Sequence, residues 1–180
     1  MKERFYIYSK IENIDLTNYL RDLPNLDVFT CDKNKYMLEI NDVYSEDFYA
    51  LLNNIEYEFY LDIVIYNDKL LLEGKLLDDI KEYMSNKRKG FYTLGDALKD
   101  SIISNNNMKE DFKKYFESKL TREIIDTALA FIKIGNALET SKRLYIHRNT
   151  LNYRLDIVKR ETSLDLKNFI DSFAFYGLMS

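Results

Sequence analysis

Cysteine, histidine, proline and glycine are scarce in this 180-residue sequence, which holds one Cys, one His, one Pro and five Gly. The single cysteine, Cys31, cannot form an internal disulfide, which excludes a disulfide-stabilised scaffold and favours a reducing compartment. His147, far from Cys31 in the chain, has no partners for a His/Cys zinc site or a His-based catalytic triad. So few prolines and glycines also argue against a many-turned all-β chain.

Long hydrophobic runs are missing as well. No uninterrupted apolar stretch approaches the roughly twenty residues that a membrane-spanning helix needs, and the first ten residues lack the apolar core of a signal peptide. A composition of 46% hydrophobic and 31% charged residues excludes a fully disordered chain. We therefore expect a globular, cytoplasmic protein without a membrane partner.

Signals for catalysis are weak. The glycines form no phosphate-binding loop, and Asp62, Asp78 and Asp79 lack the further carboxylates of a metal site. We expect neither an enzyme nor a cofactor.

The first ninety residues alternate between strand and helix patterns. Aromatic and β-branched residues predict strands, and apolar residues at intervals of three and four predict helices. The expected strands lie at 5–11, 27–31, 36–40 and 59–66, and the expected helices at 45–58 and 73–88. The second and third strands form a hairpin, and the fourth is apolar enough to be buried on both faces.

Lys87-Arg88-Lys89-Gly90 is the candidate boundary between two parts. Cations suit the C-terminus of a helix and glycine suits its cap, so this stretch is interpreted as the end of the preceding helix. Beyond it we expect helices only, interrupted by a loop at 105–107.

Residues 124–161 have the pattern of a helix-turn-helix. A first helix carries Ile125, Leu129 and Ile132 on one face and stops at Gly135. Asn136 with Glu139 has the spacing of a capping box and opens a short second helix that ends near Leu144. A three-residue turn, 145–147, leads to a third helix with apolar residues at 151, 155 and 158.

The predicted fold class is therefore α+β. A small N-terminal α/β sheet domain covers residues 1–90, and an all-α domain with a helix-turn-helix (core 122–166) covers residues 91–180.

Charge agrees with a role for this segment in binding nucleic acid. Residues 119–160 hold nine Lys/Arg against four Asp/Glu, a balance of +5, inside a chain of net charge −4. Chance clustering of solvated charge explains so modest an excess equally well, so the charge alone decides nothing.

The stretch from 138 to 166, which contains His-Arg-Asn-Thr-Leu at 147–151 and Tyr-Arg-Leu at 153–155, resembles the C-terminal helix-turn-helix of the PucR/CdaR family of bacterial transcription regulators. A Fis-type helix-turn-helix is similar but shares less. The resemblance implies promoter binding, and a preceding domain like a degenerate cyclase fold or a dimerisation or sensing module. Family members are usually longer, and no Gly-Gly-Asp/Glu-Glu-Phe motif is present, so cyclase chemistry is not implied.

The candidate partner is double-stranded DNA, read in the major groove by the helix 148–160. The candidate DNA-binding residues lie on or beside that helix: Lys142, Arg143, His147, Arg148, Asn149, Thr150, Asn152, Tyr153 and Arg154. Several of them have a second interpretation. Tyr153 either packs against the DNA backbone or covers the turn, and Arg154 either reaches phosphate or pairs with a neighbouring acid. His147 either caps the helix or contacts phosphate, and Lys142, Arg143 and Arg148 are otherwise ordinary solvated charges. The competing function is a protein-interaction or ligand-sensing module whose helix-turn-helix has lost DNA binding. The sequence also leaves open whether the protein binds a small-molecule effector.

A homodimer is expected, because one short recognition helix gives few base contacts. The apolar segment 166–179 and a sheet edge within 1–66 are the candidate surfaces. The segment has more apolar residues than one buried stripe of a helix requires: Leu166, Phe169, Ile170, Phe173 and Phe175. The alternative interpretation is that these residues complete the C-terminal core.

Overall fold

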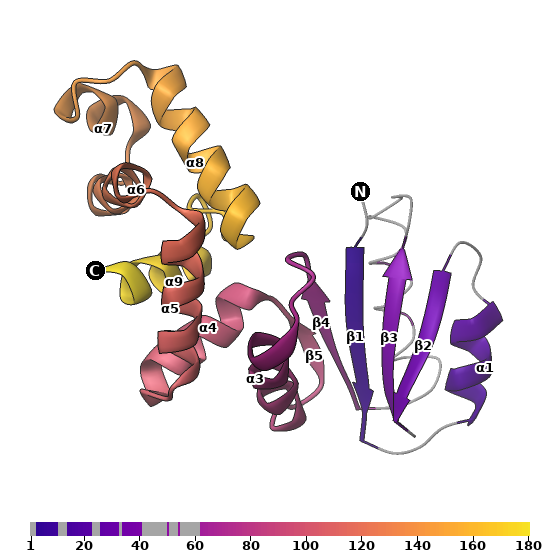
Figure 1. The fold of residues 1–180 in the computed structure, drawn as a ribbon. Helices are drawn as coiled ribbons and strands as arrows, with labels where there is room; N and C mark the ends of the chain where they lie inside the picture. Colours follow the sequence, from indigo (N-terminus) through magenta and orange to yellow (C-terminus); the bar gives the residue numbers. More distant parts are fainter. Residues whose placement is uncertain are drawn as a thin grey trace. The chain divides into compact units, whose positions relative to one another are not determined.

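The computed structural model describes residues 3–10, 14–22, 26–32, 34–40, 50, 54 and 62–180. Contacts between residues divide the chain into two compact units, Met1–Thr93 and Leu94–Ser180. The described strands all lie in the first unit and the second is helical (Figure 1), which confirms the predicted α+β class.

The first unit is built on a mixed sheet with strand order β2-β3-β1-β4-β5. The neighbouring strands are antiparallel, except that β4 and β5 are parallel. The strands are β1 (Glu3–Ser9), β2 (Leu26–Asp32), β3 (Lys35–Ile40), β4 (Ile63–Asp68) and β5 (Gly90–Tyr92). The pairing of β2 with β3 confirms the predicted hairpin, and all six residues of β4 are buried, as its apolar sequence indicated.

One prediction about this unit is wrong, one helix was not predicted, and one prediction lies outside the described residues. Gly90 does not cap a helix: α3 (Gly74–Ser85) already ends at Asn86, and Gly90, with φ +146°, opens β5. Its partner is Val64 of β4, a pairing that no local pattern reveals. The helix α1 (Ile14–Asp22) was not predicted. The helix expected at 45–58 falls on residues that are not described, apart from 50 and 54.

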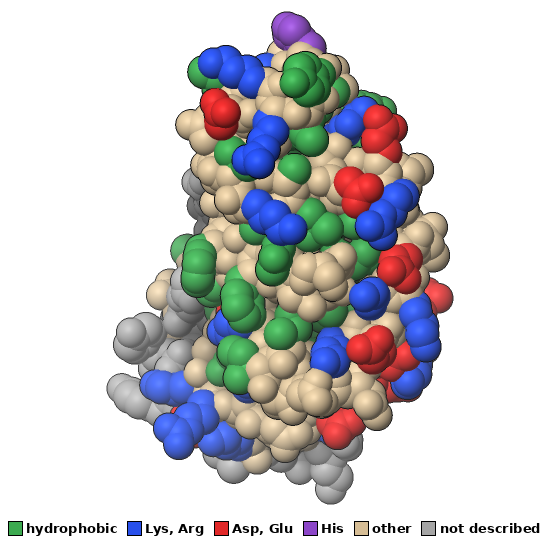
Figure 2. Space-filling view, turned by 90° about the vertical axis from the view of Figure 1, so that its left-hand side faces the viewer, with side chains coloured by type: hydrophobic (Ala, Val, Ile, Leu, Met, Phe, Trp, Pro, Cys, Tyr) green, Lys and Arg blue, Asp and Glu red, His purple; other side chains and the backbone are tan. Residues whose placement is uncertain are grey.

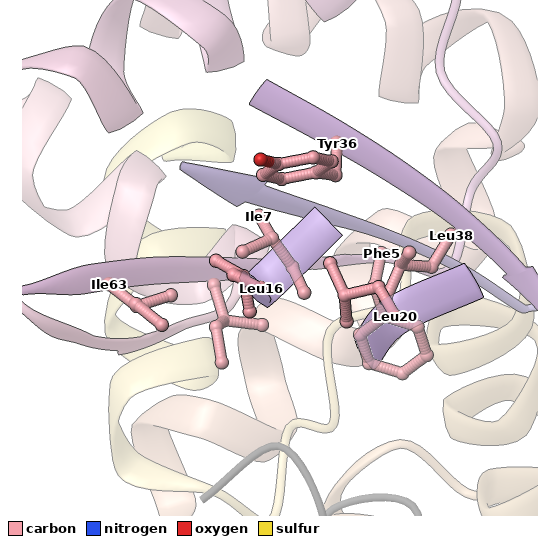
Figure 3. Packing of buried hydrophobic residues seen from close by; sticks show 8 residues of the cluster. Phe5, Ile7, Leu16, Leu20, Tyr36, Leu38 and Ile63 are labelled. Atoms are coloured by element: carbon pink, nitrogen blue, oxygen red, sulfur yellow. The ribbon is translucent and has the colours of Figure 1, made fainter. Parts of the chain in front are cut away.

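One face of the sheet carries the hydrophobic core of the unit (Figure 3). Side chains alternate between the two faces of a strand, so Phe5 and Ile7 of β1 share a face. Leu16 and Leu20 of α1 pack into the same cluster, so α1 covers this face. The remaining members come from the neighbouring strands: Tyr36, Leu38, Ile63 and Ile65.

The opposite face holds a charged group that bridges three strands. Arg4 of β1 lies opposite Glu39 of β3 and Asp68 of β4 in the strand register. Its guanidinium Nη2 is 3.1 Å from Glu39 Oε1, and its Nη1 is 3.8 Å from Asp68 Oδ2. Asp68 is fully buried and accepts hydrogen bonds from the backbone N–H of Leu72. Burial raises the pKa of the Asp68 carboxyl, and the Leu72 hydrogen bond and the Arg4 charge oppose that rise.

The second unit consists of helices in the order α4 (Leu94–Ser104), α5 (Met108–Lys119), α6 (Arg122–Ile134), α7 (Ala137–Arg143), α8 (Arg148–Thr162) and α9 (Phe169–Met179). The break between α4 and α5 confirms the predicted loop at 105–107. Helix α9 packs closely on α4, since a Cβ atom at Gly177 would lie 2.8 Å from Ile102 Cδ1. Within the described ranges, no helix is both long and apolar enough to cross a membrane.

The ion pairs of Arg4 with Glu39 and Asp68 predict that Arg4→Met lowers the stability of the protein by a large amount that depends on pH. Removing the guanidinium leaves Asp68 buried with less compensating charge, so the free energy of unfolding should fall by about 3–5 kcal/mol at neutral pH. Removal of the Arg4 guanidinium also raises the pKa of Asp68 further, and a protonated carboxyl needs no counter-charge. The loss of stability should therefore shrink as the pH falls toward about 4.

Urea unfolding of the two proteins at several pH values measures this difference. Lys10→Met is the matched control, because Lys10 pairs with Asp62 in an exposed ion pair and its loss should change stability by less than about 1 kcal/mol. Equal effects of both substitutions would contradict the prediction.

Candidate nucleic-acid interface

The helices α6, α7 and α8 form the helix-turn-helix unit that the sequence predicted. Helix α6 ends at Gly135 in a left-handed conformation with φ +71°. Asn136 then caps α7, because its side-chain oxygen accepts the N–H of Glu139 at 3.1 Å. Both features follow from local chemistry: glycine tolerates positive φ, and an asparagine side chain satisfies an unpaired N–H at a helix start.

The turn between α7 and α8 ends on a histidine cap. His147 Nδ1 accepts the backbone N–H of Asn149 at 3.1 Å, which fixes the start of α8 at Arg148. Because Nδ1 acts as an acceptor, the neutral ring carries its proton on Nε2. That N–H belongs to an exposed side chain and can donate to an anion.

The inner face of α8 is apolar and packs on α6 and α7. Leu151 and Val158 are fully buried and Leu155 is 6% exposed. These are the three positions that the spacing assigned to the core. In α6 the buried residues are Ile125, Thr127, Ala128 and Phe131. Of the three residues predicted to share the buried face, only Ile125 is buried, whereas Leu129 and Ile132 are partly buried.

The outer face of α8 carries polar side chains. Arg148 and Asn149 are exposed at its first turn, and Tyr153 is 64% exposed one turn further along. Thr150 and Asn152 are partly buried beside them. Tyr153 therefore projects from the helix rather than lying buried over the turn.

Arg154 behaves differently from the other candidate residues. Its Nη1 donates to Thr127 Oγ1 at 2.9 Å, and its Nη2 pairs with Glu123 Oε1, both on α6. The Arg154 side chain is only 17% exposed. Of the two interpretations left open, the structure has Arg154 pairing with an acid, and this contact ties α8 to α6.

The cations near this face divide into paired and unpaired groups. Lys159 pairs with Asp165 at 2.8 Å, which raises the pKa of Lys159 and lowers that of Asp165, and Arg160 pairs with Glu161 at 2.9 Å. No acid of the described chain forms an ion pair with Lys142, Arg143 or Arg148, and all three are exposed. Figure 2 views the side on which α6 and α7 lie in Figure 1, and Lys and Arg side chains project there among hydrophobic and some acidic ones.

Eight of the nine candidate residues are thus exposed or partly buried at the end of α7, in the turn or on α8. The sequence left open that Arg154 pairs with an acid but did not identify Glu123, because the two residues are 31 positions apart. It also gave no role to Tyr145, whose backbone adopts a left-handed conformation.

Comparison with known proteins supports the assignment of this unit. The model of the PucR C-terminal helix-turn-helix domain matches residues 124–177. The carbohydrate diacid regulator of Escherichia coli (strain K12) is 56% identical over 39 residues, 22% of this chain and 10% of that protein. The Leucine-rich protein of Streptococcus dysgalactiae subsp. equisimilis is 30% identical over 102 residues, 54% of this chain and 36% of that protein.

Both relatives are matched over well under two thirds of their length. A solved structure, the regulator of polyketide synthase expression from Bifidobacterium adolescentis, aligns over 99% of this chain and 79% of its own. It does so with a TM-score of 0.47 and 14% identity, too little to bear on function. Residues 124–177 are a PucR-type helix-turn-helix domain, as the sequence resemblance implied.

Leu151→Asp tests whether α8 faces the core as described. The substitution places a charge at a fully buried position between the helices, so the helical unit should lose more than about 3 kcal/mol of stability or fail to fold. Asn149→Asp, an equally acidic change on the exposed face of the same helix, is the control and should melt like the wild type. Circular dichroism melting of both variants measures the difference, and a normally folded Leu151→Asp protein would show that the facing is wrong.

Proposed function

We propose that this protein is a transcriptional regulator that binds double-stranded DNA in a sequence-specific manner, with α8 in the major groove. The observation that carries the proposal is the unpaired, exposed set Lys142, Arg143 and Arg148 on a PucR-type helix-turn-helix. Exposed cations that form no ion pair within the described residues suit the phosphate backbone and the acceptor-rich edge of guanine. On this proposal the protein acts in the cytoplasm and needs neither catalysis nor a cofactor.

The candidate residues divide into base-reading and backbone-contacting groups. Arg148, Asn149 and Asn152 lie along the N-terminal half of α8, where side chains of a recognition helix reach the bases. Arg suits guanine and Asn suits adenine, through paired hydrogen bonds.

The backbone-contacting group surrounds that helix start. On this proposal Lys142 and Arg143, at the end of α7, and the His147 Nε2–H donate to phosphate oxygens. Thr150 and Tyr153 supply hydroxyl groups beside them. Arg154 holds α8 against α6 and so positions the helix.

The test is selection of bound fragments from fragmented genomic DNA, followed by electrophoretic mobility shifts at increasing salt. Enrichment of a defined sequence, with an affinity that falls steeply as salt rises, supports the proposal. No enrichment and no shift at low salt would favour the alternative, an interaction or sensing module that does not bind DNA.

The division of labour predicts different effects of two alanine substitutions. Arg148→Ala should weaken binding to the selected fragment by about 1–3 kcal/mol and change binding to random DNA less. Lys142→Ala should weaken both about equally and lower the salt slope by roughly one. Mobility-shift titrations on both DNAs measure this, and equal effects of the two substitutions on both DNAs would contradict the division.

We further propose that the protein acts as a homodimer, because two copies double the base contacts and read half-sites about 34 Å apart. The exposed aromatic face of α9 is the candidate surface: Phe169 is 81%, Phe173 39% and Tyr176 36% exposed, at helical spacings of four and three. Leu166 and Phe175 are instead buried and complete the core. The edge strand β2, with Phe29 45% exposed, is the second candidate.

Analytical ultracentrifugation at micromolar concentration, with and without DNA, tests the dimer. Phe169→Ser with Phe173→Ser should weaken self-association if α9 forms the interface. Ile103→Ser, an exposed apolar residue of α4, should not. A protein that stays monomeric in both states and occupies one half-site would refute the dimer.

A further inference from the structure

Tyr145 occupies a backbone position that normally belongs to glycine. At the end of α7, the N–H of Ile146 donates to the Ser141 carbonyl at 3.0 Å and the N–H of Tyr145 donates to the Lys142 carbonyl at 3.1 Å. This pair of bonds is a Schellman motif, and Tyr145 is its left-handed residue, with φ +54°. A side chain on a residue in this conformation strains the backbone, and for that reason glycine is preferred there.

The fold does not account for a tyrosine at this position. The preceding helix, α6, ends in the same left-handed conformation but with a glycine, Gly135. The Tyr145 side chain is 96% exposed, so it buries almost no surface that would offset the strain. Among the residues that the structure describes, it makes no hydrogen bond or ring contact. Packing within the unit therefore gives no reason for an aromatic side chain.

The surroundings of Tyr145 are cationic. Lys142 and Arg143 precede it and Arg148 follows it; all three are exposed, and the sequence has no acidic residue from 140 to 155. Tyr145 also lies three residues before the first residue of α8. Its exposed side chain is therefore near the N-terminus of the helix that is proposed to enter the groove. An anionic polymer held by these cations would pass next to the phenol ring.

We propose that Tyr145 contacts the sugar–phosphate backbone of DNA at the edge of the groove that α8 enters. This inference rests on the proposed function and adds a residue to its backbone contacts. The phenol hydroxyl donates to a phosphate oxygen and the ring packs on deoxyribose, an arrangement that suits a side chain with an apolar body and a polar tip. The contact carries no charge and reads no base, so it strengthens binding to every sequence alike.

The experiment replaces Tyr145 by Gly and by Asn, two residues that adopt the left-handed conformation with less strain. Both variants should fold, and Tyr145→Gly should raise the melting temperature of the helical unit by about 2–6 °C. Both should also weaken DNA binding by about tenfold, equally on the fragment selected by the wild type and on random DNA. The salt slope should not change, because no cation is removed.

Tyr145→Phe separates the two parts of the contact. It keeps the ring and loses only the hydroxyl, so it should weaken binding by roughly two- to fivefold. Ile103→Ala is the matched control for loss of an exposed apolar side chain, and it should leave affinity unchanged.

Opposite changes in stability and affinity support the inference, since a structural role would lower both together. Unchanged affinity in the Gly and Asn variants would overturn it, as would a lower melting temperature in both. A loss confined to the selected fragment would also overturn it, because Tyr145 would then read a base. If the wild type binds DNA and Arg148→Ala weakens it while the Tyr145 variants do not, only this inference fails. A wild type that binds no DNA overturns the proposed function as well.

Discussion

Burial of Leu151, Leu155 and Val158 beneath α8 is the constraint on which the candidate site depends. With these side chains packed on α6 and α7, the helix has only one rotation about its axis, and its remaining residues must face outward. Arg148 and Asn149 owe their exposure to this packing rather than to any contact of their own. The orientation of the exposed residues of α8 is therefore set by the packing of the core beneath them.

The basic residues of the helical unit divide into those that form ion pairs within it and those that do not. Arg154 reaches Thr127 and Glu123 on α6 and holds two helices together, and Lys159 pairs with Asp165 beyond the end of α8. Lys142, Arg143 and Arg148 have no such partner in the described chain and keep their charge available for an outside anion. The excess of basic residues thus overstates the charge available to an outside anion, because part of it is neutralised within the unit.

The same distinction between internal and external use of charge applies in the sheet of the first unit. Arg4 lies between Glu39 and Asp68 on neighbouring strands, where cross-strand neighbours come close enough to pair. Its charge is directed inward, toward a buried carboxylate, and serves to satisfy that group. Without the positions of the neighbouring strands, Arg4 looks like an ordinary polar residue on a half-exposed strand.

The sequence by itself determined what depends on near neighbours in the chain. The spacing of Leu151, Leu155 and Val158 predicted α8 and its facing, and Asn136 and Gly135 predicted the limits of α7 and α6, because caps and helical periodicity act within a few residues. Tertiary structure decided what depends on distant partners. The three-residue strand β5 exists through pairing with β4, the role of Arg154 depends on Glu123, and α1 is stabilised by the sheet face that Leu16 and Leu20 cover.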